Sequence, residues 1–389
     1  MDYDALTIDT QTVETNGFHF DGKLLAQLKQ FAEGSPEVLV SEVVAHEILR
    51  HLRTKTLEAK EAVENAHRRA QLFGLKDATD KPFAKAVDVQ TLAKTRLDAF
   101  LKDIGATCVP AKAAPMEEII DLYHQGAPPF STSGKKKNEF PDAIALISLE
   151  QWAKTNNKHI LAISGDRDWA AFGETSKHID VVADLSDALA RLQRDADKAA
   201  AIVQHILADI KSAKRDDLAR QFETLLGEEV ASANVMAEGS SAHQFDVDSV
   251  EVHLDHFEFV EKDGDFDPQI VQAGRAVIVA GIDLQVFVTA DASFSLSTWD
   301  SIDDEWVGLG SNTVRKGGEE CDIRVLVTFE GDFASGEIDV SKVELIQGLG
   351  EIDFGEIEID YGDPDYDNVA DDSEEPAGQP EPVDENEPF

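Results

Sequence analysis

Residues 160–169 read ILAISGDRDW, and this stretch decides the fold class of the first half of the chain. The unbroken apolar run from Ile160 to Ile163 is typical of a short strand that is buried on both faces. Two acids, Asp166 and Asp168, follow the strand directly. Because sites in open α/β sheets form outside the carboxyl ends of parallel strands, the stretch predicts such a sheet with an acidic site at its edge.

The neighbouring segments repeat the pattern of a strand followed by a helix. Strands are predicted over 6–9, 38–40 and 179–182, and Ser41 is a good N-cap for the helix that follows the second of them. Helical spacing over 54–73 and 84–103 predicts a pair of inserted helices, and Phe140-Pro141 opens a further helix. This alternation predicts an α/β domain with a parallel sheet flanked by helices and carrying a helical insertion.

After residue 242 the apolar period changes from helical to two. Residues 278–288 and 323–329 alternate apolar and polar positions, and the turns between such runs contain Gly and Asp. The pattern predicts a C-terminal antiparallel β-sandwich-like domain. We therefore expect four parts: an α/β domain over 1–192, a helical connector and linker over 193–242, an acidic β-rich domain over 243–360, and a disordered acidic tail over 361–389.

Acidic charge is concentrated in the second half of the chain. Residues 1–190 carry 22 Lys and Arg against 29 Asp and Glu, a net charge of −7. Residues 241–389 carry 6 against 39, a net charge of −33. The second half should repel nucleic acid, whereas the nearly balanced first half need not.

Composition narrows the classes of protein further. The two cysteines, Cys108 and Cys321, lie far apart and predict neither a disulfide framework nor a cysteine-based zinc site. The acidic N-terminus lacks the pattern of a secretory signal, and no stretch is long and apolar enough to cross a membrane. We expect a cytoplasmic protein.

Four places supply carboxylates that a parallel sheet could bring together. Asp9 ends the first strand, Asp142 lies in the first turn of the helix that starts near Phe140, and Asp166 follows the strand at 160–163. The helix after Ser41 supplies Glu47, with Glu42 as the alternative. Clustered carboxylates repel one another and need a cation, and hard oxygen ligands select Mg²⁺ or Mn²⁺.

This ordered set of acids resembles the PIN domain family. The matching stretches are LTIDT (6–10), SEVVAHEILRHL (41–52), KKKNEFPDAIALISL (135–149) and ILAISGDRDW (160–169). The resemblance covers roughly residues 5–190 and looks most like the larger PIN-like branch with an expanded helical middle. It leaves residues 241–389 unassigned.

The resemblance implies a nuclease that depends on Mg²⁺ or Mn²⁺, with RNA as the expected partner. Carried over residue by residue, it gives four acids that are both catalytic and metal ligands: Asp9, Glu47, Asp142 and Asp166. It also gives Asp168 as a fifth catalytic acid and Ser164 as a substrate-binding hydroxyl near the metal. The basic run Lys135, Lys136 and Lys137 lies just before Asp142, where we expect it to meet phosphates.

Two other metal sites fit poorly. His46-Glu47 and His51 suggest a zinc protease, but the second histidine stands at i+5 instead of i+4, roughly 140° away round the helix. Asp263-Gly264-Asp265 begins like a calcium loop, but Gly274 occupies the position of the bidentate Glu. Solvated acidic loops are the better interpretation.

Three functions remain open from the sequence. The first is an endoribonuclease, restrained by an acidic β domain or tail that mimics phosphate at Lys135–Lys137, in phage defence or a toxin-like stress response. The second is a non-catalytic PIN-like scaffold whose β domain binds protein partners. The third is a structure-specific DNA nuclease, since RNA and DNA are told apart by contacts to the 2′-hydroxyl. We expect the acidic β domain to contact the nuclease domain or a protein partner.

Overall fold

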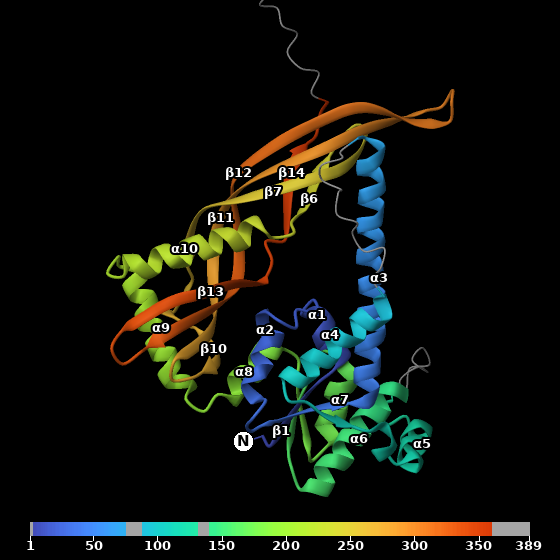
Figure 1. Cartoon of the computed structure of the whole chain (residues 1–389), viewed down its shortest axis with the longest axis vertical. Coiled ribbons are helices and arrows are strands. Elements are labelled where there is room, and N and C mark those ends of the chain that lie inside the picture. Colours follow the sequence, from blue (N-terminus) through green and yellow to red (C-terminus); the bar gives the residue numbers. More distant parts are fainter. Residues whose placement is uncertain (1–2, 75–87, 131–139, 360–389) are drawn as a thin grey trace, which may run out of the picture.

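A computed structural model describes residues 3–74, 88–130 and 140–359. Its first domain is built on a five-stranded sheet in the order β3-β2-β1-β4-β5, in which every neighbouring pair is parallel (Figure 1). The strands are β1 (Ala5–Ile8), β2 (Glu37–Ser41), β3 (Thr107–Val109), β4 (Ile160–Ile163) and β5 (Ile179–Val182). Lys135–Lys137 and the acidic tail at 361–389 lie outside the described residues.

Strands β1 and β4 lie side by side at the centre of this sheet. From β1 the chain continues to β2 on one side, and from β4 it continues to β5 on the other. The connections that leave the two central strands therefore diverge, and α/β folds place their binding sites at the carboxyl ends of strands where this happens.

Helices alternate with these strands, as the sequence predicts. They are α1 (Thr10–Thr15), α2 (Lys23–Ala26), η1 (Gln27–Phe31), α3 (Glu42–Leu72), α4 (Val89–Asp103), η2 (Ala111–Ala113), α5 (Met116–Gln125), α6 (Phe140–Asn156), α7 (Arg167–Thr175) and α8 (Leu185–Leu192). The helix after Ser41 and the segment at 54–73 form one continuous helix of 31 residues, α3. Neither Gly nor Pro interrupts residues 42–72, so nothing breaks it.

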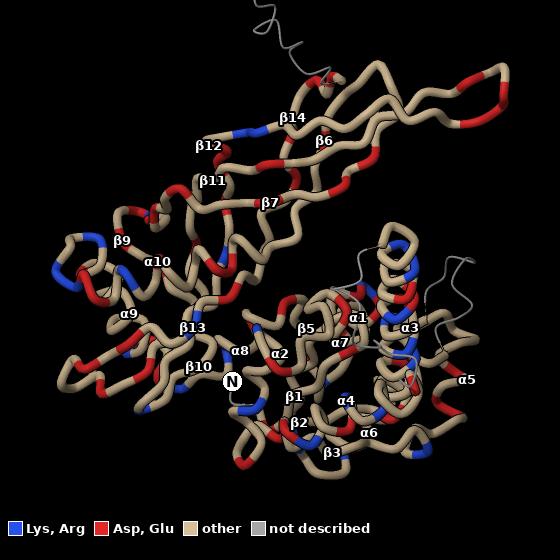
Figure 2. Tube along the Cα trace, turned by 45° about the horizontal axis from the view of Figure 1, so that its top comes forward, with Lys and Arg blue, Asp and Glu red and all other residues tan. Residues whose placement is uncertain are grey.

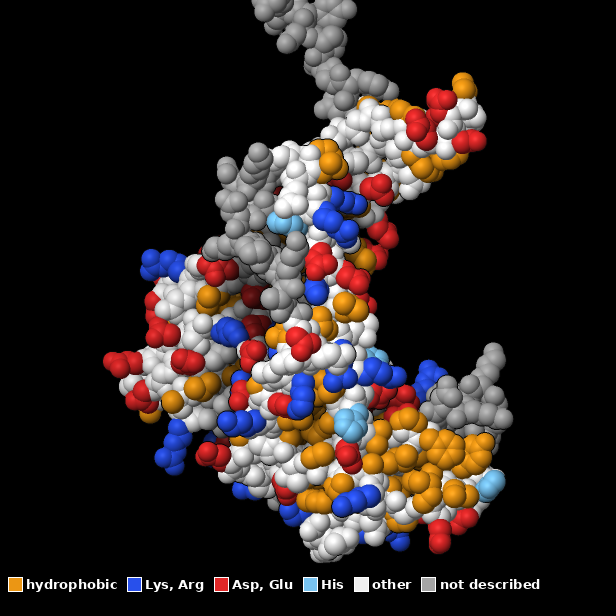
Figure 3. All heavy atoms as spheres, turned by 45° about the vertical axis from the view of Figure 1, so that its right-hand side comes forward, with side chains coloured by type: hydrophobic (Ala, Val, Ile, Leu, Met, Phe, Trp, Pro, Cys, Tyr) orange, Lys and Arg blue, Asp and Glu red, His pale blue; other side chains and the backbone are white. Residues whose placement is uncertain are grey.

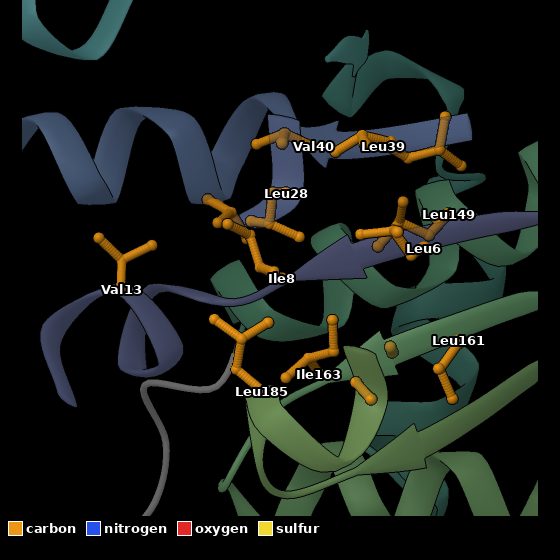
Figure 4. Close-up of a cluster of buried hydrophobic side chains, with 14 of the residues drawn as sticks. Leu6, Ile8, Val13, Leu28, Leu39, Val40, Leu149, Leu161, Ile163 and Leu185 are labelled. Atoms are coloured by element: carbon orange, nitrogen blue, oxygen red, sulfur yellow. The ribbon is translucent and has the colours of Figure 1, made fainter. Parts of the chain in front are cut away.

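The core of the first domain forms where the sheet meets its helices. Figure 4 shows side chains of three strands, such as Leu6, Leu39 and Leu161, close to Leu149 of α6 and Leu185 of α8. All five are almost fully buried. Burial of a side chain of this size contributes roughly 1.5–3 kcal/mol, so these contacts fix the sheet that positions the strand ends. The predicted parallel α/β domain is confirmed.

The second domain is an antiparallel sheet with helices on it. Its elements are α9 (Ala196–Lys211), α10 (Asp216–Ala231), β6 (Met236–Ser240), β7 (Gln244–Phe259), β8 (Glu261–Lys262), β9 (Asp265–Phe266), β10 (Gln269–Ala273), β11 (Val277–Asp300), β12 (Glu305–Asp332), β13 (Glu337–Gln347) and β14 (Glu351–Glu356). The main sheet has the order β10-β11-β12-β13, and β7 pairs with the later part of β11. The predicted antiparallel β domain is confirmed.

Different layers cover the two ends of this long sheet (Figure 1). Helices α9 and α10 share a core with the end formed by β10, β11 and β13. Near the other end the parallel pair β6–β14 packs on β11, where the rings of Phe294 and Phe354 meet edge to face. The sheet is therefore sandwich-like where β6 and β14 lie on it and helix-covered near the first domain.

The end of the sheet next to the first domain contributes side chains to two hydrophobic cores, one on each face. Alternate residues of β10, β11 and β12 face opposite ways, as the pleat of a strand requires. One set (Val271, Val279 and Leu326) joins the core of the first domain, and the other (Ile270, Ile278 and Val325) joins the core with α9 and α10. The apolar runs of these strands are continuous because both faces are covered.

Side-chain amides complete the contact between the domains. Gln193, just after α8, donates to the carbonyl of Val271 at 2.9 Å and accepts from the backbone N–H of Ala273 at 3.1 Å. Gln30 of η1 donates to the same carbonyl at 3.0 Å. The edge of β10 therefore finds hydrogen-bond partners in the first domain instead of remaining open.

Exposed apolar side chains gather on another part of the first domain. Met116, Ile120 and Tyr123 of α5 are exposed. Figure 3 shows a broad apolar area, in orange, on the lower part of the side of the molecule that it draws. Across the described ranges, no helix combines the length and the apolar character that a membrane crossing requires.

Candidate active site

Asp9 lies where β1 ends and α1 begins. As the N-cap of α1 it accepts a hydrogen bond from the N–H of Thr12 at 2.6 Å, and the hydroxyl of Ser164 donates to its other oxygen at 2.5 Å. The side chain is buried. Burial raises the pKa of Asp9 although these hydrogen bonds lower it, and the negative charge of Asp166 raises it further. Asp9 is thus both a helix cap and a buried acid.

Ser164 joins the ends of the two central strands. Besides donating to Asp9, its hydroxyl oxygen accepts from the N–H of Asp166 at 3.0 Å. Asp166 caps α7 and accepts from the N–H of Asp168 at 2.7 Å. One hydroxyl therefore holds the loop after β4 against the acid that follows β1, and the pattern Ser-Gly-Asp-Arg-Asp serves this purpose.

Asp142 lies in the first turn of α6, where the sequence predicts it. The indole N–H of Trp169 donates to its carboxylate at 3.3 Å. Burial raises the pKa of Asp142 to about 6, and the charges of Asp166, Glu47 and Asp9 add to this effect. Because such mutual repulsion requires proximity, the structure gathers the acids of four separate segments at one edge of the sheet.

Glu47 enters the same region from α3. The hydroxyl of Thr10 donates to one of its oxygens at 3.0 Å, and the guanidinium of Arg50 donates to the other at 2.8 Å. The alternative acid, Glu42, accepts from the N–H of Ala111 at 2.9 Å, in the turn after β3. The positions of the two acids therefore favour Glu47 as the member of the cluster.

The rim of the cluster contains residues that the sequence does not reveal. His51 forms a short hydrogen bond with Glu14 through Nδ1, and its Nε2 lies 3.1 Å from Arg50. Thr10, which directly follows Asp9, holds Glu47. The adjacency of Thr10 to Asp9 was an available signal, whereas the pairing of Glu14 with His51 depends on how α1 packs on α3.

The donor set suits a hard divalent cation, because it consists of carboxylate and hydroxyl oxygens. A cation would also offset the mutual repulsion that Asp142 experiences. Within the described ranges, however, no group of three or more His, Cys, Asp or Glu side chains is arranged so that it could hold a metal ion. The residues fit a divalent metal by their chemistry and mutual charge, and the side chains are not drawn into a closed ligand shell.

The fold and the site define a class: an α/β domain with a parallel sheet and acids at the carboxyl ends of its two central strands. Residues 6–169 match the family profile of the PIN domain. No curated protein and no solved structure matches the chain. The first domain is a PIN domain, a family of nucleases that typically use divalent metal ions, and the C-terminal β domain lies outside the match.

Proposed function

We propose that the PIN domain is a metal-dependent endoribonuclease. The observation that supports this most directly is the convergence of Asp9, Glu47, Asp142 and Asp166 from four segments on one sheet edge, within a region that matches a nuclease family. Helix capping accounts for Asp9 and Asp166 at helix ends, but it does not account for Glu47 and Asp142 beside them, since the charges of the four acids oppose one another. A role in binding metal and phosphate explains the arrangement.

In this proposal, each residue has a separate task. Asp9, Glu47, Asp142 and Asp166 would hold Mg²⁺ or Mn²⁺, and the bound ion would supply an activated water and offset the charge that develops on the phosphodiester. Ser164, which is buried, keeps Asp9 and Asp166 in register through its two hydrogen bonds. Trp169 and Thr10 orient Asp142 and Glu47. Asp168 is the fifth acid, and Lys135–Lys137, outside the described residues, contact phosphates.

The test is cleavage of a labelled single-stranded RNA with Mg²⁺ or Mn²⁺, compared with a single-stranded DNA of the same sequence. Asp142→Asn removes one acid with little change in shape and should abolish cleavage. Asp121→Asn, at an exposed position of α5, is the matched control and should cleave like the wild type. Cleavage of DNA alone would overturn the assignment of RNA, and equal activity of wild type and Asp142→Asn would overturn the site.

A further inference from the structure

A hollow of about 640 Å³ opens beside the acidic cluster. Its walls are the loop Gly17–Gly22 between α1 and α2, one face of α3, and one face of α4, elements that lie together in Figure 1. Leu52, Lys55, Thr56 and Ala59 line it at the three- and four-residue spacing of one helix face. Hollows of roughly 300–1,000 Å³ hold small organic ligands, so the space is large enough for one nucleotide.

The hollow has an apolar floor and a charged rim that includes two cations. Phe18, Phe20 and Leu52 are buried beneath it, while Lys55 and Arg96 stand exposed at its edge. The guanidinium of Arg96 lies 5.7 Å from the centre of the Phe20 ring. Cations placed beside aromatic rings are what proteins use to bind single-stranded nucleic acid, because the cation meets phosphate and the ring meets the base.

The charges around the hollow leave Arg96 available. Of the two acids that line the hollow, Glu14 bonds His51, and Asp21 is exposed to solvent with Lys29 3.9 Å away. Lys55 has an exposed partner in Glu58 at 2.9 Å, a type of pair that exchanges readily with solvent. In the part of the chain that the structure describes, Arg96 contacts a carbonyl oxygen and an aromatic ring instead of a carboxylate.

The β domain also faces this region, through Glu344 of β13. Its carboxylate accepts from the N–H of Lys23 at 2.9 Å and pairs with Lys342 at 2.8 Å. The negative charge of Glu344 is therefore neutralised by Lys342. His19, at the mouth of the hollow, has its pKa lowered by burial and by the nearby charge of Lys23, so it offers a neutral ring at neutral pH.

The hollow connects to the acidic cluster through one helix. Glu14 lines the hollow and bonds His51, which stands one turn after Glu47 on α3. Lys55 follows one turn after His51, eight residues beyond Glu47. At 1.5 Å per residue this separation is about 12 Å along the helix. A strand that crosses the cluster can therefore reach the hollow within a few nucleotides.

We infer that this hollow binds one nucleotide of the substrate strand, away from the scissile bond, with its phosphate at Arg96 and Lys55 and its base against Phe18 and His19. The inference rests on the proposed nuclease function and adds where the strand runs. The site would lengthen the substrate that the enzyme grips without taking part in the chemistry. Only strands that extend past the cluster would use it.

The test uses the double variant Lys55→Gln/Arg96→Gln and the matched double variant Lys94→Gln/Lys102→Gln. The control also removes two positive charges, both from α4, at positions that do not line the hollow. Two measurements are made: the Kd of a mixed-sequence 12-nucleotide RNA and of the same DNA in EDTA, and KM and kcat for cleavage of the 12-mer and of a trinucleotide with Mn²⁺.

The hollow variant should raise the Kd and KM of the 12-mer about tenfold, leave kcat within twofold, and leave the trinucleotide unchanged. Loss of contact with that one phosphate should also make the dependence of log Kd on log salt shallower by about 0.7. Equal effects of the two double variants, or an equal effect on the trinucleotide, would overturn the inference. The DNA arm shows whether the hollow distinguishes the two sugars.

The two proposals fail in distinguishable ways. If the wild type cleaves and the hollow variant binds and cleaves like it, the hollow is wrong and the nuclease stands. If the wild type cleaves neither strand but only the hollow variant loses affinity for the 12-mer, the hollow stands as a nucleic-acid site and the nuclease is wrong.

Discussion

Asp142 and Asp217 are both aspartates in the first turn of a helix, yet their pKa values are shifted in opposite directions in the two domains. In the PIN domain, burial raises the pKa of Asp142 to about 6, helped by the neighbouring acids. On α10, the guanidinium of Arg215 donates to Asp217 and holds its pKa down to about 2. The ionised carboxylate therefore lowers the stability of the fold at Asp142 and raises it at Asp217.

The difference explains how one chain carries so many acids. In the second domain most acids lie on solvent-facing positions, with the buried Glu344 as an exception. Some pair with cations: the guanidinium of Arg324 donates two hydrogen bonds, of 2.5 and 2.8 Å, to Asp283. Figure 2 shows acids spread along β7, β11 and β12, whereas α3 carries Lys and Arg interspersed with Glu. Exposed acids such as those of the second domain add net charge, which favours solubility, whereas the buried acids of the first domain form the candidate site.

The largest effect should come from removing an acid of the cluster. We expect Asp166→Asn to lower kcat/KM for RNA cleavage by about 10³-fold, on the order of 4 kcal/mol, because a metal-site carboxylate is lost. Asp217→Asn should leave cleavage unchanged. Cleavage rates of the two purified variants measure this contrast, and a comparable loss in both would show that the two kinds of acid do not differ in function.

The next effect tests whether one sheet serves two cores. Leu326 and Leu284 are both fully buried, but Leu326 belongs to the core of the PIN domain and Leu284 to that of the β domain. Substitution of either by Ala should lower the free energy of unfolding by about 2–5 kcal/mol. Only Leu326→Ala should also speed hydrogen exchange in η1 and α8, which contact the sheet. Equal exchange in the two variants would contradict the shared core.

The smallest effect concerns the stability cost of the cluster. The folded protein binds a proton at Asp142 that the unfolded chain releases, so its carboxylate opposes folding increasingly as pH rises from about 4 to about 6. In EDTA at pH 7.5, Asp142→Asn should raise the free energy of unfolding by on the order of 1 kcal/mol. The full pKa shift would give more, but Asp142 is partly exposed and solvent screens its charge.

The same stabilisation should fall by about half at pH 5.0, where much of the Asp142 carboxylate is already protonated in the folded protein. Asp217→Asn should instead destabilise slightly at both pH values, because its lowered pKa contributes stability that is lost only as pH falls from about 4 through about 2. Chemical denaturation at the two pH values gives both signs. A stabilised Asp217→Asn would contradict the comparison.

Much of the first domain follows from its local sequence. Strands β1, β2, β4 and β5 are short apolar runs with helical patterns between them, so period and length alone predict them. Strand β3 was not predicted, because Thr107–Val109 has only three residues and two of them are exposed. It exists because β2 offers an edge for it to pair with.

The boundary between helices shows the same limit. Periodicity predicts helices before and after residue 54, and the absence of Gly and Pro makes them one helix, α3. The sequence does not reveal that α9 and α10 share a core with the antiparallel sheet, because an apolar stripe shows only that a helix is covered and leaves its partner open.

By itself, the sequence determined the kinds of element, the two periodicities, the division of charge and the acids at strand and helix ends. These properties depend on residues within a few positions of one another. Only the tertiary structure decided that β4 lies beside β1, which brings Ser164 to Asp9, that Glu47 instead of Glu42 turns to the cluster, and that the loop at 17–22 forms a hollow with α3 and α4. Strand order and helix packing depend on burial summed over the whole domain, which no local pattern records.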